Sequence, residues 1–178
     1  SKLIYMASQN EDAPGAGLVV AELNDETGEL TIVQEDRTMA RGDYLNFHPS
    51  RPLLYATEIG DHCAIHAFGV DTATGKLTAL NHLPANGTSP CYVSVDARGE
   101  YALMVNYNTK EGPGNIRVYS LAGDGTLIEE TDVLEHEGGS VNPNRQQEPH
   151  PHMIVTTPDG RYVIVPDLGT DKIHIYQL

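Results

Sequence analysis

The residues best suited to chemistry lie close together, in the segment from His136 to His152. This segment holds three histidines, one arginine and two glutamates among glycines, prolines and amides. Arg145 carries a planar guanidinium, which suits a carboxylate or a phosphate. Glu148 is a potential general base or a group that orients one, and His150 and His152 would face the same side of an extended strand. The segment predicts a site that binds an anion and moves a proton; the alternative is a solvated loop that caps the start of a strand.

The same residues also offer ligands to a metal ion. His150 and His152, together with Glu148 or Asp167, supply nitrogen and oxygen donors. Because two histidines with one spacer fix no third ligand, we expect no metal. The sequence has no phosphate-binding glycine loop before a helix and no dinucleotide fingerprint, so no cofactor is expected. Cys91 has no histidine nearby in the sequence and is expected to be a small buried hydrophobic residue.

An internal repeat predicts the elements that position this segment. Three stretches, which begin at Tyr44, Tyr92 and Met153, share the order apolar strand, tight turn, apolar strand, longer loop and third strand. A second signature, a glycine turn between polar residues, recurs at spacings of 47 and 50 residues. Alternating apolar and polar residues favour strands, and no long stretch keeps a helical period. A period near 50 with four strands in each unit is typical of a β-propeller.

The chain is therefore expected to be all-β, a single partial β-propeller domain over residues 1–178. Each blade has four antiparallel strands, lettered A to D from the central channel outward. Residues 3–8, 17–23 and 30–35 are predicted as strands B, C and D of a first blade, and 152–157, 162–167 and 172–178 as A, B and C of a fourth. Two full blades between them give about 3.5 blades. Because an incomplete ring leaves sheet edges unpaired, we expect part of a longer protein or a homo-oligomer that completes the ring.

The alternation of strand direction sorts the connections between two faces of the propeller. The B–C and D–A loops share one face, which collects the irregular loops and the 136–152 segment. Glu58, Asn106 and Asp167 each follow a B strand at matching positions. We expect them at the mouth of the channel, where they either cap turns or bind a ligand.

Composition and charge restrict the partners. Lys and Arg number 11 and Asp and Glu number 25, a formal net charge of −14. This charge argues against binding to nucleic acid or to an anionic membrane, and no apolar run approaches the roughly 18 residues of a spanning helix. Two cysteines do not make a disulfide framework, so a reducing, cytoplasmic setting is expected. An anionic ligand would depend on the local charge of Arg145 and the histidines.

Several motifs together resemble the lactonase family of seven-bladed β-propellers, which includes 6-phosphogluconolactonases and fungal 3-carboxy-cis,cis-muconate lactonising enzymes. They are DxxTGxLT after the C strands, SPCYVSVDARGEY, NYN, and NPNRQQEPHPHMIVTTPDGRYVIVPDLGTDKIHIYQL. The resemblance runs along the whole chain, is strongest from Asn142 to Leu178, and makes the chain about half of a full ring. It implies a site at the channel mouth with Arg145, Glu148 and His152, and with His150 beside them.

The resemblance also implies the chemistry. For hydrolysis of a sugar lactone, His152 would be the base, Glu148 would orient it, and Arg145 would hold a phosphate or the developing oxyanion. Muconate lactonisation would use the same groups differently, and a non-catalytic propeller module for binding or assembly is a third possibility. Either substrate is a small anionic lactone or carboxylate. Family members often carry His at the position of Tyr92, so Tyr92 is expected among the substrate-binding residues, with His150, Asn106, Asp167 and Glu58.

Overall fold

The computed structural model describes residues 2–9, 15–109 and 112–178, and these residues form strands, turns and loops without a helix. A helix able to cross a membrane is therefore also absent from the described residues. The strands are β1 (Lys2–Ala7), β2 (Leu18–Leu23), β3 (Leu30–Asp36), β4 (Gly42–Phe47), β5 (Leu53–Glu58), β6 (Ala64–Val70), β7 (Leu77–Pro84), β8 (Pro90–Val95), β9 (Tyr101–Asn108), β10 (Pro113–Leu121), β11 (Leu127–Glu135), β12 (Val155–Thr156), β13 (Tyr162–Asp167) and β14 (Lys172–Gln177).

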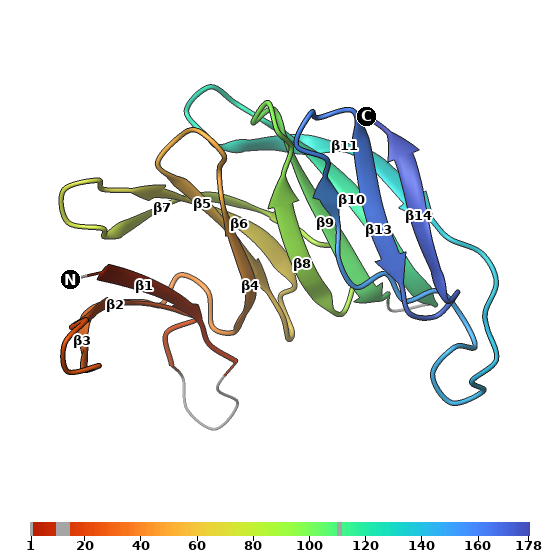
Figure 1. Cartoon of the computed structure of the whole chain (residues 1–178), viewed down its shortest axis with the longest axis horizontal. Coiled ribbons are helices and arrows are strands. Elements are labelled where there is room, and N and C mark those ends of the chain that lie inside the picture. Colours follow the sequence, from red (N-terminus) through yellow and green to blue (C-terminus); the bar gives the residue numbers. More distant parts are fainter. Residues whose placement is uncertain (1, 10–14, 110–111) are drawn as a thin grey trace.

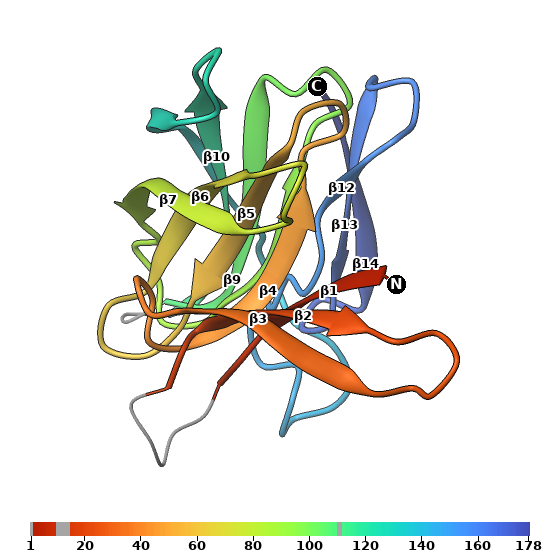
Figure 2. The same ribbon diagram turned by 90° about the vertical axis from the view of Figure 1, so that its left-hand side faces the viewer.

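The strands form four antiparallel sheets, each a meander of consecutive strands. Blade 1 is β1-β2-β3, blade 2 is β4 to β7, blade 3 is β8 to β11, and blade 4 is β12-β13-β14. Figure 1 shows these sheets side by side like the blades of a fan, and Figure 2 shows blade 1 across the front. The predicted all-β fold class, with about 3.5 propeller blades, is confirmed.

The hydrophobic core is divided into layers between neighbouring blades. A cluster around Phe68 joins blades 1 and 2, a cluster around Met104 joins blades 2 and 3, and a cluster around Ile154 joins blades 3 and 4. All three side chains are buried, and burial of such a side chain contributes roughly 1.5–3 kcal/mol. The layers hold the blades in a fixed relation, so that loops from different blades meet reproducibly on one face.

Two side-chain amides connect the outer strands of adjacent blades, and we call them the amide clamps. Gln34 of blade 1 donates to the backbone oxygen of Leu77 at 2.9 Å and accepts from its N–H at 2.7 Å. Asn81 of blade 2 does the same with Leu127 of blade 3, at 2.7 and 3.0 Å. Each amide thus satisfies both backbone groups of one residue in the next blade, which a carboxylate cannot do because it donates no hydrogen bond.

The glycine turns between C and D strands form a further contact between blades. The Tyr5 hydroxyl donates to the backbone oxygen of Gly75 at 2.8 Å, and the Tyr55 hydroxyl donates to that of Gly125 at 2.9 Å. Both glycines have positive φ, 72° and 93°, as the turn chemistry of the sequence predicts. A Cβ on Gly125 would lie 2.4 Å from the side chain of Leu53, so this turn also requires glycine for close packing.

The inner strand of blade 4 is shorter than predicted. The sequence predicts a strand over 152–157, whereas β12 covers only Val155–Thr156. Pro151 makes an isolated bridge to Asp167, ahead of the continuous ladder. Pro149 and Pro151 have no N–H to donate, so the chain before β12 cannot form a continuous ladder.

Candidate active site on the loop face

An open cavity of about 700 Å³ lies on the loop face, the face that carries the B–C and D–A loops and that is at the bottom of Figure 1. Gln9 of blade 1 lines it, together with residues from the other three blades. The lining residues that carry chemistry are Arg41, Asp43, Cys91, Tyr107, Arg145 and His152. The structure thus brings Arg145 and His152 to one cavity and adds Arg41, Asp43 and Tyr107, which the sequence did not single out.

Three of these residues occupy the same position in the repeat. Asp43, Cys91 and His152 are 48 and 61 residues apart, the spacing of the repeated stretches. The strand registers confirm this equivalence. In each blade the third residue of the B strand pairs with a residue of the A strand: Asn46↔Tyr55, Ser94↔Leu103 and Val155↔Ile164. Asp43, Cys91 and His152 each lie three residues before that A-strand residue. The start of the A strand, or in blade 4 the loop just before it, therefore contributes one side chain to the cavity in each of these blades: a carboxyl, a thiol and an imidazole.

Arg145 and His152 reach the cavity as exposed side chains of the loop before β12. Nη2 of Arg145 donates to the Tyr107 hydroxyl at 3.2 Å. The His152 ring meets the Tyr107 ring edge-on, with centroids 5.5 Å apart. A guanidinium and an imidazole on the same cavity can hold an anion and transfer a proton.

Asp43 is the carboxyl group that lines this cavity. Burial raises its pKa, while a hydrogen bond from Gln9 and attraction to His152 oppose the rise without cancelling it. A carboxyl whose pKa is raised, within electrostatic reach of an imidazole, is typical of a site for proton transfer. Its position in the repeat, equivalent to that of His152, was the signal in the sequence that could have identified it.

Cys91 lies in the wall of the cavity beside these groups. Burial, together with the nearby carboxylate of Asp43, raises the pKa of its thiol to about 12. The thiol therefore stays protonated at neutral pH and is a poor nucleophile, which agrees with the packing role that the sequence predicts.

His150 and Glu148 take positions different from those of Arg145 and His152. His150 is buried: its ring stacks on Tyr107 with centroids 4.4 Å apart, and its Nδ1 donates to the backbone oxygen of Tyr107 at 3.0 Å. Glu148 is partly buried and is not among the residues that line the cavity. Its backbone oxygen lies so close to Gly169 that a Cβ there would be 1.8 Å away. Among the lining residues, the carboxyl group that interacts electrostatically with His152 is that of Asp43.

The three residues that follow the B strands are buried and anchor loops. Glu58 accepts a hydrogen bond from the backbone N–H of Ala40 at 2.7 Å, and Asn106 donates to the backbone oxygen of Ala85 at 2.9 Å. Asp167 accepts from the backbone N–H of His150 at 2.9 Å. In every case the partner belongs to the D–A loop that enters the same blade. Two roles are expected for these residues from the sequence, capping of turns or binding of a ligand, and the hydrogen bonds that they make are of the capping kind.

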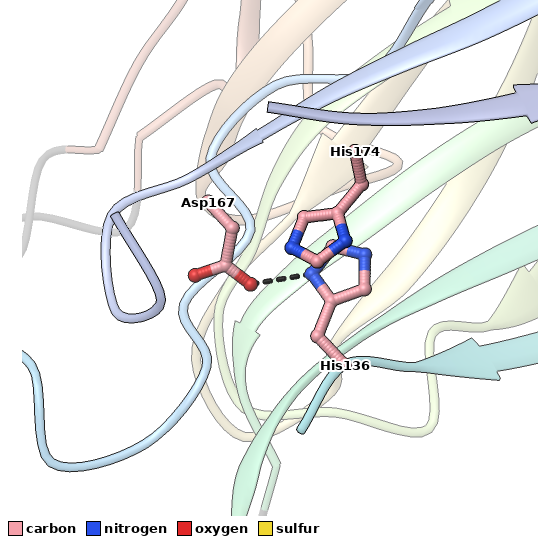
Figure 3. Close-up of side chains that lie close together, drawn as sticks. All are labelled: His136, Asp167 and His174. Carbon is pink, nitrogen blue, oxygen red and sulfur yellow. Dashed lines mark hydrogen bonds and ion pairs between the residues drawn. The ribbon is translucent and has the colours of Figure 1, made fainter. Parts of the chain in front are cut away.

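Asp167 belongs to a larger, mostly buried network, of which Figure 3 draws His136, Asp167 and His174. Nδ1 of His136 donates to its Oδ2 at 2.5 Å, and Nε2 of His136 pairs with the Tyr176 hydroxyl at 2.7 Å. His174 stacks on His136 with centroids 3.6 Å apart and pairs through Nε2 with the Thr170 hydroxyl. Burial, and then proximity to His136, lower the pKa of His174.

The ligand atoms of His136, Asp167 and His174 lie within 4.8 Å of one another, a set of two imidazoles and a carboxylate that could hold a metal ion. The metal ligands considered from the sequence, His150 and His152, are not in this set. The face-to-face stacking of the two rings keeps their nitrogen lone pairs in separate parallel planes, and a shared ion requires those lone pairs to converge. The geometry fits a hydrogen-bond network better than a metal centre.

Tyr92 lies on the inner strand of blade 3, against its equivalent on blade 2. The rings of Tyr44 and Tyr92 stack with centroids 4.0 Å apart. Burial, and next a hydrogen bond with Tyr44, raise the pKa of Tyr92 to about 12. Tyr92 follows Cys91 directly but is not among the residues that line the cavity. A phenol with a raised pKa stays protonated near neutral pH, so Tyr92 is not suited to be a general base.

Comparisons with known proteins bear on this geometry. A family model described as "Lactonase, 7-bladed beta-propeller" matches residues 4–178. The 6-phosphogluconolactonase of Bacillus subtilis is 32% identical over 163 residues, 91% of this chain and 45% of that protein. A crystal structure of a putative 6-phosphogluconolactonase from Bacteroides fragilis is 30% identical with a TM-score of 0.86, over 99% of this chain and 48% of that one.

A periplasmic gluconolactonase from Pseudomonas aeruginosa is 25% identical with a TM-score of 0.86, over 99% of this chain and 50% of that one. The chain thus spans about half the length of the relatives that it matches.

Proposed function

Because the chain belongs to the lactonase family of seven-bladed β-propellers, we propose that its loop-face cavity hydrolyses a lactone, and that the substrate is a sugar lactone such as 6-phosphogluconolactone. The observation that carries the proposal is the convergence of Arg41, Asp43, Arg145 and His152 on one open cavity. The names of relatives, 6-phosphogluconolactonase and gluconolactonase, support the substrate class.

The two guanidiniums explain how an acidic chain accepts an anion. The formal net charge of −14 repels an anionic substrate at long range. Arg41 and Arg145 supply fixed positive charge at the cavity, and a guanidinium suits the paired oxygens of a phosphate. We assign Arg145 to the anionic end of the substrate, and Arg41 to the carbonyl oxygen that becomes negative during attack.

His152 acts as the general base. It takes a proton from a water molecule while the water oxygen forms a bond to the lactone carbonyl carbon. When the tetrahedral intermediate collapses, the ring C–O bond breaks, the ring oxygen takes the proton from the imidazolium, and a sugar acid results. Asp43 stabilises the imidazolium in between, since it attracts a positive charge on His152. This reaction needs no redox change.

The test is a lactone hydrolysis assay on protein whose mass in solution has been measured. Acid release from 6-phosphogluconolactone is recorded against the spontaneous rate, with gluconolactone and a muconolactone as comparison substrates. We expect Arg145→Ala to lower kcat/KM on the phosphorylated lactone by about 100-fold or more. We expect a smaller loss of kcat/KM on gluconolactone, because that substrate has no phosphate for Arg145 to bind.

The matched control is Arg98→Ala, an exposed arginine in the turn between β8 and β9 on the opposite face. It removes the same charge away from the cavity and should leave turnover unchanged. Turnover by the unaltered protein no faster than the spontaneous rate, or equal rates for the two arginine variants, would refute the proposal.

A further inference from the structure

Tyr107 is fixed in place by its own backbone. It is the residue after Asn106 near the end of β9, and its N–H donates to the backbone oxygen of Ser89 at 2.8 Å. Its backbone oxygen accepts from Nδ1 of His150 at 3.0 Å. The main chain of Tyr107 is therefore tied to the loop that enters blade 3 and to the loop that enters blade 4. Because the backbone of Tyr107 is fixed at both its N–H and its oxygen, the direction in which its side chain leaves the backbone is well defined.

The side chain of Tyr107 touches three members of the 136–152 loop. Its ring is stacked on His150, with planes 5° apart, and it meets the ring of His152 edge-on. Its hydroxyl accepts a hydrogen bond from Nη2 of Arg145 at 3.2 Å. One residue of blade 3 thus sets the positions of the two loop residues that line the cavity, Arg145 and His152.

The partner of the Arg145 guanidinium is a neutral phenol rather than a carboxylate, and this difference affects how well Arg145 can bind an anion. Arginine has a long, flexible side chain, and an exposed arginine loses rotamer entropy when it binds a ligand. A phenol hydroxyl restrains the guanidinium without neutralising its charge, and among the described residues the side chain of Arg145 has no other hydrogen-bond partner, so its other N–H donors can bind an anion. Arg117 shows the contrast: its Nη1 lies 2.5 Å from the Glu130 carboxylate, and that ion pair neutralises its charge.

We propose that Tyr107 is a positioning residue, which pre-organises Arg145 through its hydroxyl and His152 through its ring for binding of an anionic substrate. The inference rests on the proposed function for the identity of the substrate. It goes beyond that function because Tyr107 itself takes no part in the proton transfers. The contribution of the hydroxyl acts through Arg145, so the effect of removing the hydroxyl should vanish when Arg145 is removed.

The experiment is a double-mutant cycle with Tyr107→Phe, Arg145→Ala and the double variant, measured on the full chain. Tyr107→Phe keeps the ring contacts and removes only the hydroxyl. Two readouts are recorded: kcat and KM on 6-phosphogluconolactone, and calorimetric binding of 6-phosphogluconate and of inorganic phosphate. The control is Tyr101→Phe, which removes a hydroxyl from the other end of the same strand.

We expect Tyr107→Phe to raise KM and the Kd for 6-phosphogluconate about 5- to 10-fold with little change in kcat and in the unfolding midpoint. In the Arg145→Ala background the same change should have no further effect, because interacting side chains are not additive. Additive effects of the two changes, or a Tyr107→Phe variant that behaves like Tyr101→Phe, would overturn the inference.

The two readouts separate this inference from the proposed function. If the unaltered protein hydrolyses the lactone and Tyr107→Phe is neutral, the function stands and the positioning role fails. If the protein binds 6-phosphogluconate without hydrolysing the lactone, the function fails and the binding cycle still decides the role of Tyr107. If it neither binds the anions nor turns over the lactone, both are refuted.

Discussion

The carboxylate of Asp167 lies 2.5 Å from Nδ1 of His136, and its other oxygen accepts the backbone N–H of His150 at 2.9 Å. One buried carboxylate therefore holds both ends of the loop that carries Arg145. Closing a loop costs chain entropy, and here the closure is made by hydrogen bonds to a charged group, each of which contributes roughly 1.5–3 kcal/mol. The position of Arg145 thus depends on Asp167 of β13, which does not itself line the cavity.

Replacing this carboxylate should destabilise the chain. Asp167→Asn keeps the shape but places an amide N–H₂ or a neutral oxygen against Nδ1 of His136. We expect a loss of about 2–3 kcal/mol in the free energy of unfolding, measured by urea denaturation. The matched control is Asp171→Asn, an exposed residue of the same turn whose positive φ of 58° asparagine tolerates. Equal stability of the two variants would contradict the role of Asp167.

The same network predicts a dependence of stability on pH. Burial alone raises the pKa of Asp167, but hydrogen bonds from His136, His150 and Thr170 outweigh it and lower the pKa to about 2, from an ordinary value of 3.8. Because the folded pKa is the lower one, this stabilisation is complete above about pH 4 and is lost as the pH falls towards 2. The loss is about 2 kcal/mol.

The measurement is the free energy of unfolding at several pH values between 5 and 2, for the unaltered chain and for Asp167→Asn. Other carboxyl groups titrate in both proteins, so the difference between the two curves isolates Asp167. We expect that difference to shrink as the pH falls. A constant difference over this range would show that Asp167 does not titrate with a lowered pKa.

The amide clamps should stabilise the contact between blades. Asn81→Ala removes two hydrogen bonds to Leu127 and should lower the free energy of unfolding by about 1–2 kcal/mol. Hydrogen exchange of the Leu127 amide should become faster, since its N–H loses its acceptor. Asn81→Asp is the informative comparison: it keeps an acceptor for that N–H but places a charge against the backbone oxygen. Protection of Leu127 unchanged in Asn81→Ala would rule out the clamp.

Gly169 should be intolerant of any side chain. A Cβ at this position would lie 1.8 Å from the backbone oxygen of Glu148, and 2.8 Å from the backbone nitrogen of His150. Both contacts are with backbone, so Gly169→Ala must displace the loop that carries Arg145. We expect lower stability together with weaker binding of 6-phosphogluconate by calorimetry. Gly112→Ala is the control, because no described residue lies within 4 Å of the added Cβ there, and similar behaviour of the two variants would contradict the prediction.

Much of the candidate site could be predicted from the sequence, but the residues that line the cavity are not all the ones that the sequence predicted. The repeat placed Arg145 and His152 on the loop face, because strand alternation alone decides which connections share a face. Glu148 and His150 are near them in sequence, yet neither lines the cavity within the described residues. Asp43 and Arg41 are more than 100 residues away and line it, because their blade packs beside the others.

The amino-acid sequence by itself determined the local elements: the alternating strands, the positive-φ glycine turns such as Gly125, and the repeat that makes consecutive strands pair as blades. These features depend on backbone preferences and on hydrophobic periodicity, which act over a few residues. Only the tertiary structure decided that Asp167 ties down a loop rather than lining the cavity, and that Asp43 lies in the same cavity as His152. The reason is that these partners come from different strands or blades, and their distance is set by packing between sheets, which no short-range pattern encodes.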